Sequence, residues 1–338
     1  MMDMERSELL EQIKKLKANY SEGNEYNVFP IEGMEHKIGV SKEGYPKFFV
    51  CTNDSGSSTQ NTNLEILSVE YNMLCTFVDD IGIPLQKHYT IITLRSIDET
   101  LQSEFLDIVL MVLKRLPSIP SKREIALEVE NLISIFSAMK CPPRKEIQGL
   151  WAELLVIERS LSPENLINAW HESPTSKYDF TLGRDKIEVK STSSEVRKHH
   201  FSLDQLNPSV NSRLLIASVI VRESGQCETG LSILDLYDKI CERVLSVDAR
   251  LHLYQVIIET LGADNKKLTN VFFDYVEASD KLKFFDFNDI PGINKDSIMR
   301  GVSKIGFDSD LTGIVDVQDS DSSFNVIDSP LFSSLFNI

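Results

Sequence analysis

Three charged residues between positions 178 and 192 have the types and the spacing that hydrolysis of a phosphodiester requires. They are Asp179, Glu188 and Lys190, within the stretch YDFTLGRDKIEVKST. Two carboxylates can bind Mg²⁺ through oxygen and leave coordination positions for water and for a phosphate oxygen. A lysine beside them can orient or activate the attacking water and offset the negative charge that develops on phosphorus. These residues therefore predict metal-assisted catalysis with Mg²⁺ as the cofactor, for which Mn²⁺ can substitute.

A β-hairpin is expected to bring the three side chains together. Strands are predicted at residues 178–182 and 186–190, and Gly183 between them can adopt the positive φ of a tight turn. Side chains alternate along a strand, so Glu188 and Lys190 project from one face. The same pattern also arises by chance, and alternating charges are common on the solvated face of an antiparallel hairpin. The surroundings of the hairpin must decide between the two interpretations.

Two flanking segments supply further candidates. Upstream, residues 148–158 have the pattern of an amphipathic helix in which Glu153 lies beside the apolar stripe. A buried carboxylate is costly unless it is paired or bound to metal, so Glu153 is either an additional metal ligand or a boundary residue that reaches solvent. Downstream, Gln205 falls in the first turn of a predicted helix, from which it could contact the scissile phosphate. Ser202 and Gln205 also form a capping box, which we favour for Gln205 on the sequence alone.

A short basic cluster follows the hairpin. It consists of Arg197, Lys198, His199 and His200. Such a cluster can bind along a nucleic-acid backbone, and a solvated loop is the equally supported alternative. Another histidine, His171, stands at the end of a short predicted helix. A histidine at that place is more often a favourable partner of the helix dipole than a catalyst.

The order of these elements is similar to that of a known nuclease core. An apolar run at residues 214–221 follows Gln205 and predicts a strand that is buried on both faces. Helix, hairpin, Gln205 and buried strand together resemble the core of the PD-(D/E)xK restriction-endonuclease-like superfamily. More narrowly, they resemble a bacterial family described as PD-(D/E)xK members, which is often associated with phage-defence gene clusters. The resemblance rests on GLWAELLVIERSL from Gly149, YDF from Tyr178, EVKST from Glu188 and HFSLDQL from His200, and it covers roughly residues 145–245. Tyr178 stands where the superfamily name has proline, and this departure removes no catalytic group.

The resemblance implies a Mg²⁺-dependent DNA endonuclease that belongs to a bacterial phage-defence or restriction system. Asp179, Glu188 and Glu153 would then bind metal, Lys190 would activate the water, and Gln205 would assist at the phosphate. DNA and other subunits of the system are the expected partners. Two alternatives stay open. One is an RNA nuclease, which shares this chemistry, and the other is a catalytically silent scaffold or recognition subunit that keeps the nuclease fold.

The expected fold is α/β (α+β), with a restriction-endonuclease-like core of mixed sheet flanked by helices. The expected regions are a helix at 5–18 and a β-rich module in residues 1–95, a helical bridge at 96–140, the nuclease core at 141–245, and an α+β extension with an acidic tail at 246–338. Capping boxes at Ser96–Glu99 and Ser121–Glu124 predict the starts of the two bridge helices. In the extension, a helix closed by Gly262 precedes strands predicted at 270–277, 281–287, 303–307 and 312–317.

Composition and charge constrain the setting of this chemistry. The five cysteines are far apart and include no C-x-x-C pair, which argues against disulfides or a zinc finger and predicts a cytoplasmic protein. The sequence shows no apolar signal core or membrane-spanning run, so no membrane partner is expected.

The net charge of −16 should repel DNA from most faces, although residues 177–198 hold six basic against four acidic side chains. Delivery by a partner subunit would then be useful. A homodimer would allow both strands to be cut, but no coiled-coil heptad argues for one.

Overall fold

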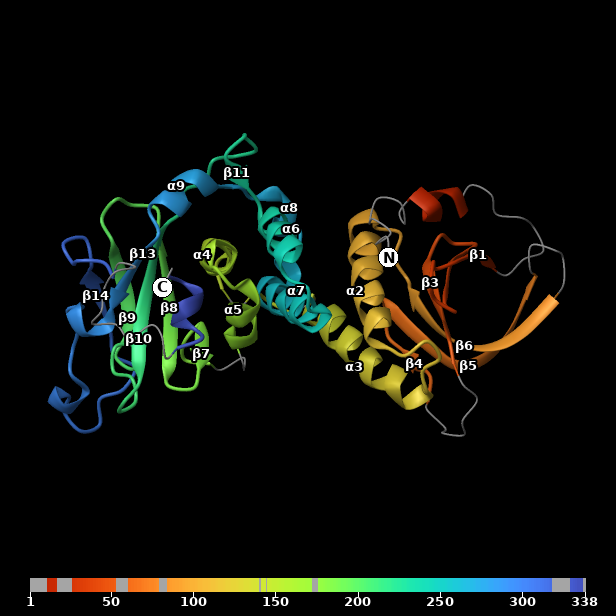
Figure 1. The fold of residues 1–338 in the computed structure, drawn as a ribbon, viewed down its shortest axis with the longest axis horizontal. Helices are drawn as coiled ribbons and strands as arrows, with labels where there is room; N and C mark the ends of the chain where they lie inside the picture. Colours follow the sequence, from red (N-terminus) through yellow and green to blue (C-terminus); the bar gives the residue numbers. More distant parts are fainter. Residues whose placement is uncertain are drawn as a thin grey trace. The chain divides into compact units, whose positions relative to one another are not determined.

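The computed structural model describes residues 11–16, 26–52, 60–78, 84–139, 141–143, 145–171, 176–317 and 329–336. The fold is mixed α+β, and the chain divides into two units, Met1–Ser137 and Ala138–Ile338 (Figure 1). Residues 11–16 of the predicted N-terminal helix are helical, whereas the acidic stretch at 318–323 lies outside the described residues. Within the described part of the chain, no helix is both long enough and apolar enough to cross a membrane.

The N-terminal unit is built on an antiparallel sheet of six strands in the order β1-β2-β3-β6-β5-β4. The strands are β1 (Tyr26–Pro30), β2 (Lys37–Ser41), β3 (Pro46–Cys51), β4 (Thr62–Asn63), β5 (Leu67–Val78) and β6 (Pro84–Leu94). Aromatic and β-branched side chains fill both faces of β3, where Phe48 contacts Phe105 and Phe49 contacts Tyr89. The antiparallel strands predicted for this stretch are therefore present.

Two helices complete the N-terminal unit, α2 (Glu99–Arg115) and α3 (Lys122–Ala138). Ser121 and Glu124 form the predicted capping box of α3, because the Ser121 N–H donates to the Glu124 carboxylate and the Glu124 N–H donates to Ser121 Oγ. The predicted capping box of α2 is wrong. Asp98 is the residue that caps this helix, through a hydrogen bond accepted from the Leu101 N–H at 3.0 Å.

The C-terminal unit contains a four-stranded sheet in the order β13-β10-β8-β7. Its strands are β7 (Phe180–Leu182), β8 (Asp185–Thr192), β10 (Arg213–Ile220) and β13 (Lys283–Asp286). β7 and β8 form the predicted antiparallel hairpin, and Gly183 between them has a φ of +57°. β10 runs parallel to β8 and antiparallel to β13, and it is buried from its second residue onward, as its apolar run predicted.

Helices pack against this sheet and against one another, and α4 contributes Glu153 to the functional site. They are α4 (Ile147–Arg159), α5 (Pro163–Ala169), α6 (Ile233–Arg243), α7 (Val247–Leu261), α8 (Lys267–Asn270) and α9 (Tyr275–Asp280). Figure 1 shows α4 between the sheet and α6. This placement buries every residue of α4 from Leu150 to Glu158. The predicted amphipathic helix is therefore a buried helix, covered on both sides.

The remaining elements correct several expectations. They are β9 (Lys198–Ser202), β11 (Gly230–Leu231), β12 (Phe273–Asp274), β14 (Gly306–Asp310) and the short 3-10 helices Gly262–Asp264, Phe287–Asp289, Lys295–Ser297 and Phe332–Ser334. The strand predicted at 270–277 is mostly wrong, because Asp274 caps α9 instead. No helix follows Ser202, since β9 pairs with β14 and the Leu203 N–H continues this pairing to Ile305. Residues 312–317 form no strand.

Candidate active site

A cavity of about 780 Å³ opens beside β8 in the C-terminal unit. The five residues predicted to be catalytic all line it: Glu153, Asp179, Glu188, Lys190 and Gln205. They come from α4, from the residue before β7, from β8 and from the turn after β9. A parallel neighbour on one side of β8 and an antiparallel hairpin on the other fix the position of this strand in the sheet. The fold therefore assembles side chains that are far apart in the sequence around one cavity.

Asp179 is fixed by its side chain to the hairpin and by its backbone to His171. Its Oδ2 accepts a hydrogen bond at 2.8 Å from the N–H of Val189, which lies between Glu188 and Lys190 on β8. Its carbonyl accepts a hydrogen bond from the His171 N–H at 2.9 Å. The carboxylate is thus fixed just before the first strand of the hairpin, and its Oδ1 can contact other groups.

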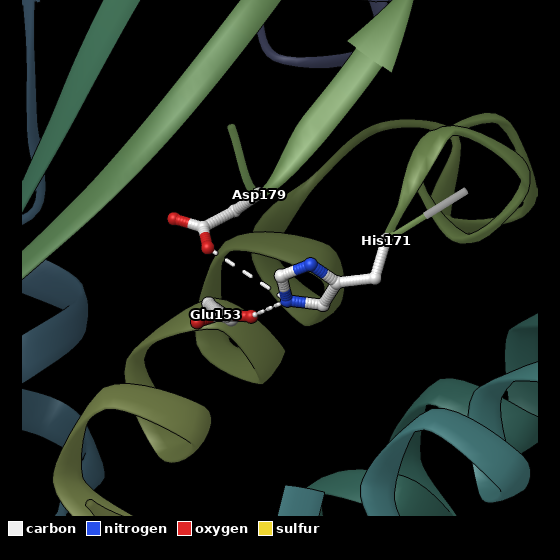
Figure 2. Close-up of side chains that lie close together, drawn as sticks. All are labelled: Glu153, His171 and Asp179. Carbon is white, nitrogen blue, oxygen red and sulfur yellow. Dashed lines mark hydrogen bonds and ion pairs between the residues drawn. The ribbon is translucent and has the colours of Figure 1, made fainter. Parts of the chain in front are cut away.

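Glu153, His171 and Asp179 form a group whose ligand atoms all lie within 4.8 Å of one another (Figure 2). His171 Nε2 lies 2.8 Å from Glu153 Oε2 and 3.7 Å from Asp179 Oδ1. The indole N–H of Trp170 donates to the same Glu153 oxygen at 2.8 Å and so fixes that carboxylate. Glu153 is buried, which removes the interpretation of a boundary residue that reaches solvent.

His171 was not predicted to belong to the site. It follows α5, as expected, but its ring lies against Glu153 and its backbone has a φ of +42°. Only a few per cent of residues other than glycine adopt this left-handed conformation, in which histidine is enriched, and such strain is concentrated at functional positions. The sequence signal was its place between a helix and the hairpin. That signal alone could not show which way the ring points.

A lysine that sequence reasoning did not consider lies at the centre of this group. Lys145 Nζ is 2.6 Å from Glu153 Oε1, 2.7 Å from Asp179 Oδ1 and 3.2 Å from His171 Nε2. Burial opposes the charged form of Lys145, yet the two carboxylates outweigh burial and raise its pKa above the ordinary value. Lys145 belongs to no motif, and it reaches Asp179 only because the fold brings residues 34 positions apart together.

Glu188, Lys190 and Gln205 form the adjoining part of the site. Lys190 Nζ lies 2.8 Å from Glu188 Oε1, and Gln205 donates from Nε2 to the same oxygen. Gln205 Oε1 in turn accepts from Lys190 Nζ at 3.3 Å and from the Ser202 N–H at 3.0 Å. The predicted capping contacts of Gln205 therefore exist, although in a turn and not at a helix start. The same amide also holds the predicted catalytic glutamate.

The three carboxylates differ in their proton affinities. Burial alone would raise the pKa of Glu153, but its hydrogen bond with His171 and the charge of Lys145 outweigh burial and lower the pKa to about 2. Burial and the charge of Glu153 raise the pKa of Asp179. Burial and the charge of Asp179 raise the pKa of Glu188 to about 8, against the opposing effect of Lys190. Burial and mutual repulsion therefore favour the protonated forms of Asp179 and Glu188, and an added cation beside them would favour their charged forms.

The basic cluster does not form one surface, which corrects the expectation for its four residues. Side chains alternate from Arg197 into β9, so that Arg197 and His199 are buried whereas Lys198 and His200 are exposed. Arg197 donates to the carbonyl and hydroxyl of Ser218, and to the carbonyl of Lys281. On the exposed side, Lys198 and His200 both pair with Asp308 of β14.

The donor set at Glu153, His171 and Asp179 fits a divalent cation. Carboxylate oxygens are the usual ligands of Mg²⁺ and Mn²⁺, and an imidazole nitrogen is accepted more readily by transition metals than by Mg²⁺. Two opposite ligands of Mg²⁺ lie about 4.2 Å apart at its usual bond length, close to the present spread of the three ligand atoms. The ammonium of Lys145 shows that a cation is already favoured at this point.

Comparisons with known proteins agree with the geometry. A family model described as "Putative PD-(D/E)XK family member" (DUF4420) matches residues 11–312, which include every residue that lines the cavity. Comparisons with curated proteins and with solved structures gave no match. This match confirms the predicted family resemblance. The PD-(D/E)XK superfamily implies nuclease activity, and the fold is nuclease-like. Because the match spans most of the sequence, the chain belongs to this PD-(D/E)XK family.

Proposed function

We propose that this protein is a metal-dependent endonuclease that hydrolyses DNA phosphodiesters as part of a bacterial phage-defence system. The observation that carries the proposal is the convergence of Glu153, Asp179, Glu188 and Lys190 around one cavity. A structural hairpin would place such charges in solvent, whereas three of these side chains are buried. Burying several carboxylates together costs stability, and a catalytic site that binds a cation accounts for that cost.

Each residue has a role that follows from its contacts. Glu153, His171 and Asp179 would hold the cation, which supplies the positive charge that stabilises the transition state of phosphodiester hydrolysis. Glu188 is a proposed further ligand. It lines the same cavity, and it is close enough to Asp179 for the negative charge of Asp179 to raise its pKa.

Lys190 and Gln205 act on the substrate side. The Lys190 ammonium is placed to orient the attacking water and to offset charge on the phosphate oxygens. The Gln205 amide forms one hydrogen bond with Glu188 and one with Lys190, and so fixes their positions relative to each other. Both roles depend on side chains that are fixed before substrate arrives, which is how electrostatic stabilisation becomes effective.

The overall charge indicates how DNA would reach this site. A net charge of −16 disfavours association with DNA over most of the surface, and the exposed Lys198 and His200 of β9 both pair with Asp308. Delivery by other subunits of the defence system, or a homodimer that cuts both strands, would supply the missing affinity. The chemistry of the cavity does not require a basic surface, because the cation and Lys190 act at the phosphate itself.

The proposal is tested by incubating the protein with Mn²⁺ or Mg²⁺ and equal amounts of labelled DNA and labelled RNA. We expect cleavage of DNA that disappears in the Asp179→Asn variant and on addition of a chelator. Preferential cleavage of RNA would replace the proposed substrate with RNA. The proposal would be overturned if calorimetry showed no metal binding by the wild type, either with or without DNA.

A catalytically silent scaffold is the second candidate, and the same net charge favours it. The two functions differ in one measurable property. A scaffold would tolerate Lys190→Ala in any assay of the whole defence system, because it needs the fold and not the ammonium. A nuclease would lose the activity of the system with that single change.

A further inference from the structure

Lys145 occupies the point at which the proposed metal ligands converge. Its Nζ lies 2.6 Å from Glu153 Oε1 and 2.7 Å from Asp179 Oδ1, and His171 Nε2 is 3.2 Å away. A divalent metal would form bonds of about 2.1 Å to carboxylate oxygens of the same kind. The centres of the ammonium and of such a metal would therefore nearly coincide. One site cannot hold both cations at once.

The two carboxylates need a cation whether or not metal is present. The side chain of Glu153 is 3% exposed and that of Asp179 is 8% exposed. Removing one partner from a buried ion pair leaves an uncompensated charge and is strongly destabilising. In the absence of metal, Lys145 supplies the charge that keeps the two carboxylates together.

Lys145 also differs from Lys190, the other lysine of the site. The Lys145 side chain is 36% exposed and comes from the segment that precedes α4, whereas the Lys190 side chain is 18% exposed and comes from the central part of β8. Rotation about its own side-chain bonds would take the Lys145 ammonium into solvent without a change in the sheet. Lys190 is paired with Glu188, which is not one of the three convergent ligands.

We propose that Lys145 is a built-in counter-cation that holds Glu153 and Asp179 ready for metal and gives up its place when a divalent cation enters. The proposal rests on the metal site of the proposed function. It assigns Lys145 a positioning role: the residue preserves the ligand geometry of the metal-free protein and lowers the apparent affinity for metal. Metal binding and occupancy by Lys145 are then competing equilibria for the same two oxygens.

The test is calorimetric titration of Mn²⁺ alone into the wild type and into Lys145→Met, which keeps the aliphatic length and removes the charge. We expect Lys145→Met to bind Mn²⁺ roughly tenfold more tightly, which corresponds to the loss of one competing ion pair. Lys145→Arg keeps a competing cation and should bind no more tightly than the wild type. Lys177→Ala is the matched control, because Lys177 lines the same cavity but donates to the carbonyl of Asn207. It should leave the affinity unchanged.

A second readout separates the positioning role from a general loss of structure. Without metal, Lys145→Met should melt at a lower temperature than the wild type, and saturating Mn²⁺ should remove that difference. Weaker or equal Mn²⁺ binding by Lys145→Met, with binding by the wild type intact, would overturn the role of Lys145 and leave the proposed function standing. Failure of both proteins to bind Mn²⁺, with and without DNA, would overturn the metal site itself.

Discussion

Gln205 donates a hydrogen bond from its side-chain amide to Oε1 of Glu188, which lies 17 positions earlier in the sequence. The carbonyl oxygen of the same amide accepts hydrogen bonds from the Ser202 N–H and from Lys190. One side chain thus joins the turn after β9 to β8, the strand that carries the proposed catalytic residues Glu188 and Lys190. The sequence offered a capping role and a phosphate contact as alternatives for Gln205. The structure shows the capping contacts and, in addition, the hydrogen bond to Glu188, while the phosphate contact stays a prediction.

Gln205→Ala should therefore lower DNA cleavage while leaving a folded protein. Without the amide, Glu188 and Lys190 lose a shared partner, and misplacement of catalytic groups by about 1 Å can cost on the order of 10²-fold in rate. Ser202→Ala is the matched control, because it removes the hydroxyl that accepts from the Gln205 N–H but leaves the contact with Glu188. The rates of both variants are compared at saturating metal. A larger loss in Ser202→Ala than in Gln205→Ala would contradict the assignment.

Lys190→Ala should abolish cleavage without unfolding the protein. The ammonium is the group placed to stabilise charge at the phosphate, and removing one such donor costs roughly 10²–10³-fold in rate. The Lys190 side chain is only 18% exposed and contacts buried Glu188, so its loss should also lower stability by about 1–2 kcal/mol. Lys198→Ala, at a side chain that is 60% exposed, serves as the control and should change neither property. Cleavage rate and thermal melting are measured on the same preparations. An insoluble Lys190→Ala protein would mean that the lysine is structural.

His171→Asn should weaken Mn²⁺ binding more than Mg²⁺ binding. Imidazole nitrogen favours transition metals, whereas Mg²⁺ depends mainly on the carboxylates of Glu153 and Asp179. Asparagine tolerates the left-handed backbone at this position, so the variant tests the ring and not the chain conformation. His200→Asn, at an exposed ring of β9, is the control. Calorimetry with each metal gives the two affinities. An equal decrease for both metals would indicate that His171 only orients Glu153.

Much of the hairpin and its strand partner could be predicted because their signals are local. Alternation, the turn glycine Gly183 and the apolar run at 214–221 each report on neighbours within a few residues. Lys145 and His171 could not be found in this way. Their contacts with Asp179 and Glu153 join residues 34 and 18 positions apart, and they depend on the packing of helices against the sheet.

The errors elsewhere have similar physical causes. The basic stretch from Arg197 to His200 lacks the apolar alternation that marks a half-buried strand, because Arg197 and His199 take the inward positions. Their polar groups bond to Ser218 on β10, a strand of another sheet, and the sequence does not indicate this partner. The run at 270–277 resembles a strand, but its last residues lie in α9, because the Asp274 carboxylate accepts a hydrogen bond from the Glu277 N–H and caps this helix.

Arg197→Ala should destabilise the fold and should not primarily weaken DNA binding. The guanidinium donates to Ser218 and to the carbonyl of Lys281, and the acceptors would be left without these bonds in a buried place. Hydrogen bonds to charged groups are each worth about 1.5–3 kcal/mol, so we expect a loss on the order of 3 kcal/mol in the free energy of unfolding. Urea unfolding gives this value. Lys198→Ala, from the exposed side of the same strand, should stay within about 0.5 kcal/mol of the wild type. A stable Arg197→Ala protein with weakened DNA affinity would restore the basic-surface interpretation.

His199 should make the protein sensitive to mild acid. Its ring lies 2.8 Å from the Ser218 hydroxyl, and burial together with the charges of Lys190 and Arg197 lowers its pKa from 6.5 to about 4. Between these two values the unfolded chain binds a proton that the folded chain does not, so the free energy of unfolding falls as the pH decreases through this window. The loss reaches about 3 kcal/mol once the pH is below both values. Urea unfolding of the wild type and of His199→Asn is measured at several pH values across this window. The effect is the difference between the two proteins in how steeply the free energy of unfolding changes with pH. Equal slopes would show that His199 is already protonated in the folded protein or that it titrates as it does in the unfolded chain.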